Sequence, residues 1–461
     1  MPAAVYTEIT FTALKSQVAE ALGDSGMVFY TDSDITHYIY EALTVFQSMS
    51  NYWRETAQFQ PGALTRWAVL SDTSTNLLNV SSQHALVSDI TDRELLQHVL
   101  SDLIETAPNT PGDWSGAWSL TDHFSKSEIV SALNRVYHRF FGEVGCYIRP
   151  VTLTLSPGKE YFQLPENTFD VLSVALIDNV TNPSSPTRYP LFKTGREDFD
   201  FYRGYGVLTP GTPNAWSLDS DTLLLRIFPP AIDTGQLEVM VYQFPSPDLD
   251  PSTSETALQI PPNLWWILKY GLLADLLRHD GESADWPRAE YCEQRWQDGI
   301  NLAKLQLPTI INARVNDQQI IQSQFLDEES NNQAWAQERG LPSRLIVASW
   351  DLLSPVPIRT STTDIATIEL LLAQQVRLPV GGDDIVQLPK DAVNAIVEYG
   401  KHCALLKTSG AEFGQSMEAY KKLVEYAMEY NQILLANSKT FGFNAEKGGD
   451  SRNREFKEKG E

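Results

Sequence analysis

The sequence lacks the residues and motifs on which most active sites and metal sites depend. It has only three cysteines, none in a C-x-x-C pair, so neither a disulfide framework nor a zinc site is expected. This low cysteine content is consistent with a protein that occupies a reducing compartment. Its seven histidines include no H-E-x-x-H pair, and neither G-x-x-x-x-G-K-S/T nor G-x-G-x-x-G occurs. The G-x-S-x-G motif is absent as well. These absences predict a protein that is not an enzyme and that holds no cofactor and no metal.

Positive charge and long apolar runs are also scarce. The chain carries 35 Lys and Arg against 59 Asp and Glu, a formal net charge of −24, whereas proteins that grip nucleic acid need basic surface. The longest apolar run, residues 264–277, is interrupted by Lys269 and Asp275 and is shorter than the roughly 20 residues of a membrane span. The N-terminus has no basic stretch followed by an apolar one. We therefore expect no signal peptide, no membrane partner and no sequence-specific DNA binding.

Apolar and aromatic residues, in contrast, are plentiful. Hydrophobic residues make up 42% of the chain and aromatic residues 10%, with 11 tryptophans, which is enough to fill two ordinary cores. A chain of 461 residues exceeds the usual limit for one hydrophobic core. The composition therefore predicts two domains.

Two stretches near the N-terminus repeat one pattern. Residues 30–43 (YTDSDITHYIYEAL) match residues 124–137 (FSKSEIVSALNRVY) at a constant offset of 94. Each begins with Ser or Thr followed by an acid, as helix N-termini do, and continues with apolar residues at helical spacing. A strand-like alternation follows each copy, at residues 55–59 and 148–155. The sequence therefore predicts a helix-then-strand unit that occurs twice.

A second repeat, at an offset of 129, relates the middle of the chain to its C-terminal part. Residues 211–213 recur as residues 340–342, both G-x-P, and Tyr-Gly at residues 270–271 recurs at residues 399–400. Apolar pairs between these two matches follow the same offset. Ile-Pro at residues 260–261 and Leu-Pro at residues 388–389 precede the two helical pairs, at an offset that is one residue shorter. Internal self-similarity of this extent indicates a duplicated module.

The order of the repeats predicts that one module is nested in the other. A front half occurs twice and is followed by a back half that occurs twice, so the simplest arrangement inserts one module into its host. We predict an outer module at residues 1–112 plus 311–444, an inserted module at residues 113–310 and a polar C-terminal tail at residues 445–461. Each module would combine antiparallel helices with a small β-rich subdomain, which is an α+β fold.

Local patterns place the elements within these modules. Residues 154–163 are expected to form a hairpin that turns at Pro157-Gly158, and a β-rich middle follows at residues 171–244. The expected helices are residues 264–278, 289–305, 392–407 and 416–435.

Three histidine positions are candidates for chemistry. His98 has acidic neighbours that suggest a metal site or an acid–base pair, although the pattern favours an exposed helix face. His279 is expected at a helix end, where the helix dipole stabilises a protonated histidine. The pair His402-Cys403 falls in the middle of an apolar helix, so Cys403 is expected in the core rather than as a nucleophile.

Four pairs of acidic or aromatic residues have both a binding and a structural interpretation. The acidic pairs lack the spacing of a calcium-binding loop, so we interpret them as solvated turns. The aromatic pairs suggest a ligand platform, but adjacent helical residues face different sides, so one is expected in the core and the other against a neighbouring helix or subunit. The pairs are Asp248 with Asp250, Asp383 with Asp384, Trp265 with Trp266, and Phe140 with Phe141.

Several segments resemble the adaptor, or head–tail connector, proteins of tailed phages. They are residues 30–53 (TD-x-D-I-x-x-Y-I-x-E-A-L, then YWR), residues 91–105 (TDRELLQHVLSDLIE), and residues 164–174 (LPENTFDVLSV), followed in order by PLF, G-x-P, a strand ending in FPP and an Ile-Pro helical pair. The resemblance covers most of the chain through diffuse patterning. Members of that family are usually shorter and have a single module, so the nested duplication is a departure from their pattern.

The resemblance implies a structural role in the virion. Similar proteins are not enzymes and form a ring, commonly of twelve copies, that binds the portal protein and tail or nozzle proteins. Genomic DNA would pass through the ring without sequence recognition, and an acidic lining suits this because basic walls would hold phosphates. The implied location is the neck of the virion, after synthesis in the host cytoplasm.

The C-terminal segment contains candidate contacts with partner subunits. Residues 445–461 have the composition of a disordered tail, and two phenylalanines precede it in a polar setting. Either these phenylalanines anchor a partner, or they end the last helix against the core. The candidate partner contacts are Phe441, Phe443, Arg452, Arg454 and Phe456.

Two other functions remain open. A baseplate or fibre-anchoring tail protein would use its two modules to hold different partners and would follow threefold or sixfold symmetry. A glycan-binding or hydrolytic module would use exposed aromatic residues of the β-rich middle as a platform, and the candidates are Trp216, Tyr202 and Tyr205.

Overall fold

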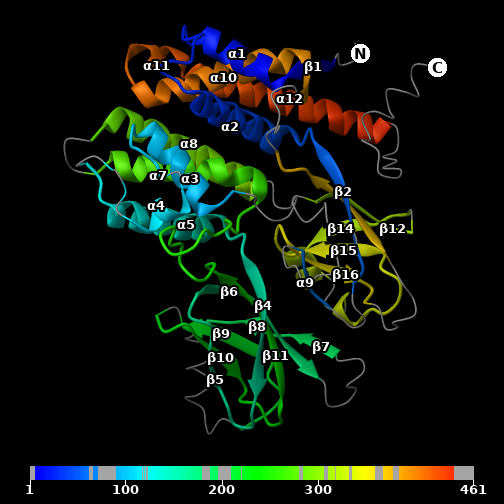
Figure 1. Cartoon of the computed structure of the whole chain (residues 1–461). Helices are drawn as coiled ribbons and strands as arrows, with labels where there is room; N and C mark the ends of the chain where they lie inside the picture. The colour runs from blue at the N-terminus through cyan, green and yellow to red at the C-terminus, as the bar shows by residue number, and fades with distance from the viewer. Residues whose placement is uncertain are drawn as a thin grey trace.

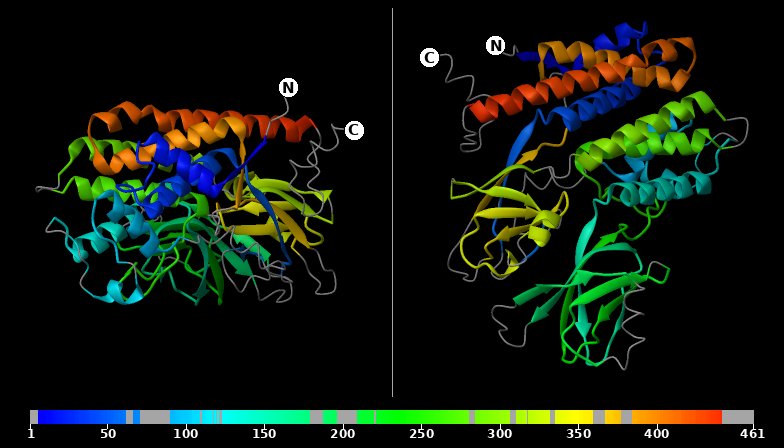
Figure 2. Two further views of the ribbon diagram at one scale, coloured as in Figure 1. Left: turned by 45° about the horizontal axis from the view of Figure 1, so that its top comes forward. Right: turned by 180° about the vertical axis from the view of Figure 1, so that it is seen from behind.

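The structure is a computed structural model, and it describes residues 6–61, 66–70, 90–108, 110–116, 118, 120, 123–178, 187–195, 209–219, 221–279, 284–305, 310–316, 318–331, 335–358, 367–376 and 384–440. Helices and mainly antiparallel sheets occur together in these residues, which confirms the α+β class. The long helices are stacked in one layer, and the strands form two groups beneath it (Figure 1). The views in Figure 2 show the same arrangement from two other directions.

Strand pairing divides the described residues into two units. The outer unit combines residues 6–70 with residues 310–440, because strands of the first segment pair with strands of the second. The inner unit is residues 90–305, and its described strands pair with one another. The helices of both units meet in the helical layer.

The outer unit contains helices and strands from both of its segments. Its helices are α1 (Phe11–Ala21), α2 (Asp32–Ser50), α10 (Lys390–Thr408), α11 (Ala411–Ser416) and α12 (Glu418–Thr440), with the short α9 (Phe325–Asn331) beside the sheets. Its strands are β1 (Tyr6–Thr10), β2 (Arg54–Phe59), β3 (Ala68–Val69), β12 (Ile310–Val315), β13 (Gln318–Gln319), β14 (Ile321–Gln324), β15 (Arg344–Val347), β16 (Leu352–Val356), β17 (Ile368–Ala373) and β18 (Ile385–Pro389).

The inner unit contains its elements in one continuous segment. Its helices are α3 (Asp92–Asp102), α4 (Pro111–Ser115), α5 (Lys126–Val144), α7 (Trp265–Leu277), which follows the 3-10 turn Pro262–Leu264, and α8 (Trp286–Leu305). Its strands are β4 (Ile148–Leu155), β5 (Tyr161–Gln163), β6 (Thr168–Asp178), β7 (Thr187–Pro190), β8 (Phe192–Lys193), β9 (Ala215–Asp219), β10 (Leu224–Phe228) and β11 (Gly235–Gln243).

The two units have the same order of strands. The inner unit has four-stranded sheets with the orders β4-β11-β6-β7 and β5-β10-β9-β8, and the outer unit has β2-β17-β12-β13 and β3-β16-β15-β14. In each unit one pair is parallel, β8 with β9 and β14 with β15. The inner unit thus builds from one segment the topology that the outer unit builds from two.

Helices α2 and α5 match in length and at both ends. Each has 19 residues, and both of their ends are 94 positions apart, as the sequence predicts. Each begins with a capping box, at Thr31 and at Ser125, which satisfies N–H groups of the first turn. Each ends at a residue with left-handed backbone, Asn51 and Gly145. Strands β2 and β4 then start at the same distance from their helices.

The first helix of each unit is held by the same backbone contact. The N–H of Phe11, at the start of α1, donates to the carbonyl of Asp384 at 3.0 Å. The N–H of Asp92, at the start of α3, donates to the carbonyl of Thr256 at 2.9 Å. Positions 256 and 384 are 128 apart, so α7 and α10, which follow them, occupy equivalent places.

Contacts between helices give the same offset of 128, one less than the sequence matches predict. Arg135 on α5 pairs with Asp275 on α7. Its equivalent Glu41 on α2 lies 3.5 Å from the thiol of Cys403 on α10. Positions 275 and 403 are therefore equivalent. The Ile-Pro and Leu-Pro pairs that precede the helices, at residues 260–261 and 388–389, are also 128 positions apart. With this offset, Glu398 is the equivalent of Tyr270.

The predicted hairpin at residues 154–163 is wrong. Strand β4 pairs with β11, whereas β5 pairs with β10 in the facing sheet. The Pro157-Gly158 turn thus crosses from one sheet to the other, and the N–H of Gly158 donates to the carbonyl of Ala231 at 2.7 Å. Turn chemistry predicts a reversal of the chain but not which strand becomes the neighbour.

The predicted helices and the β-rich middle are confirmed, and each group of elements has its own core. Helices α7, α8, α10 and α12 lie where the pattern predicts them, with α11 as a separate turn before α12. One apolar cluster runs through the helices of both units. Each pair of sheets encloses a cluster of its own, and a smaller one lies between the two pairs.

Candidate functional site

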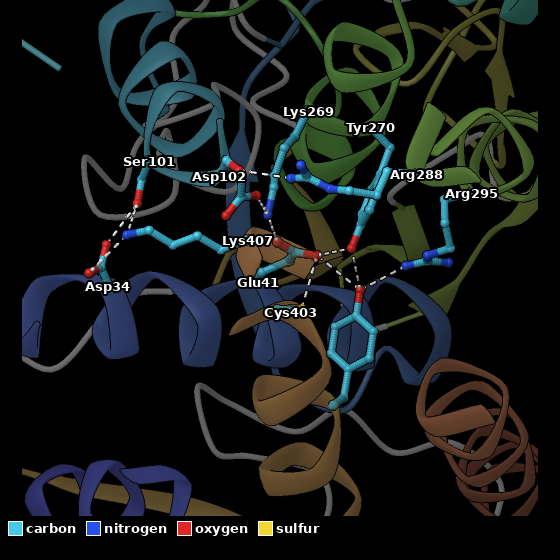
Figure 3. Close-up of polar contacts among 11 residues, drawn as sticks. Asp34, Glu41, Ser101, Asp102, Lys269, Tyr270, Arg288, Arg295, Cys403 and Lys407 are labelled. Carbon is cyan, nitrogen blue, oxygen red and sulfur yellow. Dashed lines mark hydrogen bonds and ion pairs between the residues drawn. The ribbon is translucent and has the colours of Figure 1, made fainter. Parts of the chain in front are cut away.

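A cluster of buried charges lies where the helices of the two units meet (Figure 3). The Nζ of Lys269 on α7 lies 2.5 Å from Oε2 of Glu41 on α2 and 2.7 Å from Oδ2 of Asp102 at the end of α3. Each of these side chains is 1% exposed. Arg288 on α8 donates to the backbone carbonyl of Asp102 at 2.9 Å. Since Glu41 belongs to the outer unit and the others to the inner unit, the cluster joins the two units.

Two tyrosines and an arginine extend this cluster. The hydroxyl of Tyr270 donates to Oε1 of Glu41 at 2.7 Å, and the hydroxyl of Tyr399 donates to the same oxygen at 2.9 Å. Arg295 on α8 donates to the Tyr399 hydroxyl at 2.8 Å. Glu41 therefore accepts from both units, which fixes how α2 lies against α7 and α8.

Burial and pairing together set the charges of the cluster. Burial alone would raise the pKa of Glu41, but Lys269 and the hydrogen bonds that Glu41 accepts hold this pKa below its usual value. Burial would lower the pKa of Lys269, but Asp102 and Glu41 raise it. Burial raises the pKa of Asp102 in spite of Lys269. Lys269 and Glu41 thus stay charged at neutral pH, and their loss would leave a charge buried without its partner.

Aromatic rings pack beside the charges, and one of them corrects an expectation from the sequence. His98 is 6% exposed, so the prediction of an exposed helix face is wrong. Its ring centroid lies 4.8 Å from that of Trp265 and 4.2 Å from that of His37. Burial, and then the charges of His37 and Lys269, lower its pKa well below the usual value. The pattern of α3 alone cannot reveal that α2 of the other unit covers this face.

A second set of buried charges joins the two groups of sheets. Arg188 on β7 is fully buried and pairs with Glu238 on β11 at 2.8 Å and with Glu329 on α9 at 2.7 Å. Arg66 of the outer unit pairs with the same Glu238 at 2.8 Å. The two units are therefore joined by ion pairs at the level of the sheets as well as at the level of the helices.

Trp216 does not form an exposed platform for a glycan. It is 1% exposed, and its indole N–H donates to the carbonyl of Leu191 at 3.2 Å inside the inner unit. That expectation is wrong because the side chain points between the two sheets rather than to solvent. Tyr202 and Tyr205 lie outside the described residues.

The aromatic pairs are buried within the chain. Trp265 stacks on Tyr40 of α2, with ring centroids 5.3 Å apart. It therefore contacts a helix of the other unit, as expected for the member of the pair that lies against a neighbouring helix. Trp266 lies under the guanidinium of Arg295, 4.9 Å from its ring. Phe140 and Phe141 are both 0% exposed.

The remaining histidine, cysteine and acidic candidates have structural environments. His402 and Cys403 are buried, which confirms the core position predicted for Cys403, and burial raises the pKa of the Cys403 thiol well above its usual value. Nε2 of His279, just after α7, lies 3.8 Å from a carboxylate oxygen of Glu128. Asp248 is exposed, and the carboxylate of Asp250 accepts a hydrogen bond from the N–H of Ser252 in a turn. The backbone carbonyl of Asp384 accepts from the N–H of Phe11, and Asp383 lies outside the described residues. No group of three or more potential metal ligands occurs among the residues that the structure describes.

Comparison with protein families decides between the broad classes that this geometry leaves open. The model of the SU10 adaptor protein family matches residues 90–320, half of the chain. The chain belongs to the SU10 adaptor protein family. Among curated proteins, none matches this sequence. Membership in an adaptor family implies a structural phage protein that contacts other head or tail proteins in the virion neck.

The family match has a clear relation to the fold of this adaptor. It starts at residue 90, where the inner unit starts, and ends 15 residues after α8. The outer unit lies mostly beyond the match. In the described part of the adaptor, no helix is both long and apolar enough to cross a membrane.

The candidate partner contacts at the C-terminus of this adaptor stay predictions. Residues 441–461 lie outside the described residues. The candidates there are Phe441, Phe443, Arg452, Arg454 and Phe456.

The buried charge cluster of this adaptor was not predicted from the sequence, although a signal was present. Glu41 and Lys269 are opposite charges, and each falls inside a predominantly apolar helical run. A charge in such a run is buried only with a partner. The 228 positions between them prevent local patterns from pairing the two residues.

Proposed function

We propose that this chain is a structural virion protein that forms a ring between the portal vertex and the tail and lines the passage of the genome. The match of the adaptor family model to residues 90–320 carries the proposal. The proposed partners are the portal protein, tail or nozzle proteins and further copies of the chain.

We also propose that the two units are copies of one adaptor module, one of them inserted into the other. The shared strand order, the matched ends of α2 and α5 and the matched contacts of α1 and α3 support this. They favour an inserted module at residues 90–305 rather than at 113–310, because α3 is then the equivalent of α1. Limited proteolysis of the intact chain should leave a resistant fragment close to residues 90–305. Early cleavage within that range would contradict the nested arrangement.

The charge of the chain suits a passage for DNA. The formal net charge is −24, and an acidic lining repels phosphates, whereas a basic lining would bind them and retard the genome. DNA would therefore pass through the ring without recognition of its sequence. The protein would be made in the host cytoplasm and then built into the neck.

The location of the protein in phage particles tests this function. Antibodies against residues 151–244 should label the neck in electron micrographs of intact particles. Label at the distal tail would instead favour a baseplate role. Particles that stay unlabelled until they are disrupted would indicate a buried position. Absence of the protein from disrupted particles would contradict a structural role altogether.

A further inference from the structure

The contact between the two units uses only part of each unit's helical surface. The outer unit contributes α2 and the face of α10 that carries Tyr399 and His402, and the inner unit contributes α3, α7 and α8. The equivalents of α2, α3 and α7 are α5 in the inner unit and α1 with α10 in the outer unit. Figures 1 and 2 show α5 at one edge of the helical layer and α1 with α10 at the opposite edge. Each edge thus presents a helix face that the chain does not use in the contact between its own units.

Helix α5 provides the first of these unused faces. Helix α2 is buried on all sides from Tyr38 to Ser50, whereas α5 buries one side. On its other side, α5 has exposed or partly exposed residues where α2 has buried ones. They are Glu128, Asn134, Arg135, His138, Arg139 and Gly142. Asn134, His138 and Arg139 also contact Leu249, Asp248 and Glu293 of their own unit.

Helix α10 provides the second unused face. Asp391, Asn394 and Glu398 form an exposed stripe at helical spacing. Their equivalents, 128 positions earlier, are the buried residues Asn263, Trp266 and Tyr270. Two of these three reach the outer unit. Asn263 donates to the carbonyl of Gln374 at 3.1 Å, and Tyr270 donates to Glu41 at 2.7 Å.

The two unused faces carry opposite charges at their centres. Within the chain, Glu41 on α2 accepts from Tyr270 on α7. The equivalent positions hold Arg135 on α5 and Glu398 on α10, so the same geometry between two chains would bring a guanidinium to a carboxylate. The Arg135 side chain is 61% exposed and already contacts Asp275 of its own unit. A guanidinium has five N–H donors and can bind a second carboxylate.

We propose that the α10 face of one copy of this chain docks on the α5 face of a second copy, which repeats between chains the contact that α2 makes with α7 within the chain. The proposal rests on the proposed adaptor function and on the equivalence of the two units. The contact is head-to-tail, because each copy offers two different faces, so its repetition closes a ring or extends a helix. Arg135 and Glu398 mark the centre of the contact.

Cross-linking in assembled particles tests this docking. The native cysteines Cys146, Cys292 and Cys403 are buried, so cysteines introduced by Arg135→Cys and Glu398→Cys on exposed positions would react first. Particles that carry the double variant are treated with a short thiol-to-thiol cross-linker and denatured. We expect a ladder of bands at multiples of the 51.7 kDa chain.

A mismatched pair and the single variants serve as controls. Ser156 is exposed and lies in the turn between β4 and β5, and Figure 1 shows β5 on the side of the inner unit that is far from the helical layer. The combination of Ser156→Cys with Glu398→Cys should therefore give no ladder. Particles that hold the double variant at the wild-type level but give no ladder overturn the docking and leave the adaptor function standing. Absence of the wild-type protein from particles contradicts the adaptor function instead.

Charge reversal provides a second, independent test. Like charges at a contact cost several kcal/mol, so Arg135→Glu should lower the amount incorporated into particles at least about tenfold. Adding Glu398→Arg should restore incorporation. Failure of the second change to restore it, while the double variant still folds with the wild-type circular dichroism spectrum, would overturn the proposed pairing.

Discussion

Helices α2 and α5 have the same length and the same kind of cap at both ends, yet their surroundings differ. The inner unit covers α2, where Tyr40 stacks on Trp265 and Glu41 pairs with Lys269, and both residues are buried. The equivalent positions of α5 are Asn134 and Arg135, which solvent reaches. The difference indicates two kinds of contact. A face that is buried during folding can be apolar or can hold buried ion pairs. A face that binds a partner only after folding is exposed to water beforehand and is therefore more polar.

The largest expected effect comes from the buried lysine at the α2 contact. Lys269→Met leaves Glu41 and Asp102 buried without their cation, and we expect it to lower the free energy of unfolding by about 3–5 kcal/mol. The matched change on the open face, Arg135→Met, should cost about 0–1 kcal/mol because the pair it breaks is exposed to solvent. Urea titrations followed by tryptophan fluorescence measure both. Equal losses would contradict the distinction between the two faces.

Two glycines sharpen the comparison between the equivalent helices α7 and α10. A Cβ on Gly271 would overlap the ring of Trp296 and come 2.7 Å from Val136, whereas one on Gly400 would meet Val18 at an ordinary 3.5 Å. We expect Gly271→Ala to lower the free energy of unfolding by about 1–3 kcal/mol through overpacking. Gly400→Ala should be neutral, or stabilising by up to about 1 kcal/mol through helix propensity. Thermal unfolding separates them, and a neutral Gly271→Ala would refute the close packing.

The pH dependence of stability distinguishes the covered face from the open one. The folded chain keeps His98 neutral, because burial holds its pKa well below 6.5. As the pH falls below about 6.5, the unfolded chain binds a proton that the folded chain does not, so this residue makes stability fall. His98→Asn should reduce that loss by up to about 1.4 kcal/mol per pH unit. His138→Asn on the open face of α5 is the control, and an equal change in both profiles would count against the burial of His98.

The smallest effect should be the same in both units. Thr31 and Ser125 each accept from the backbone N–H three residues later at 3.2 Å, in matching capping boxes. We expect Thr31→Ala and Ser125→Ala to lower the free energy of unfolding by about 1 kcal/mol each. Chemical denaturation of the two variants provides the measurement. Losses that differ severalfold would show that the two caps are not equivalent.

Local features of the fold could be predicted from the sequence, and long-range ones could not. The caps at Thr31 and Ser125 and the apolar spacing of α2 and α5 are local, so the pattern predicts both helices and their offset. The neighbour of β5 and the burial of His98 depend on a second sheet and on a second unit. Local patterns contain no information about such partners.

The candidate site was less predictable than the fold for the same reason. Lys269 is visible in the sequence as a charge inside an apolar run, but its partners Glu41 and Asp102 lie far away in the chain. The open face of α5 can be recognised only once α2 is seen to be covered. Resemblance to a family predicts the broad role, whereas the faces proposed to join the chains could be identified only in the structure.

A cryo-electron microscopy reconstruction of the virion neck that resolves side chains would test the central claim most directly. We predict that inner and outer units alternate around the neck, with Arg135 of each chain against Glu398 of the next and with the same packing between chains as between the units of one chain. A neck in which α5 faces solvent, or in which this chain has no density, would contradict the account.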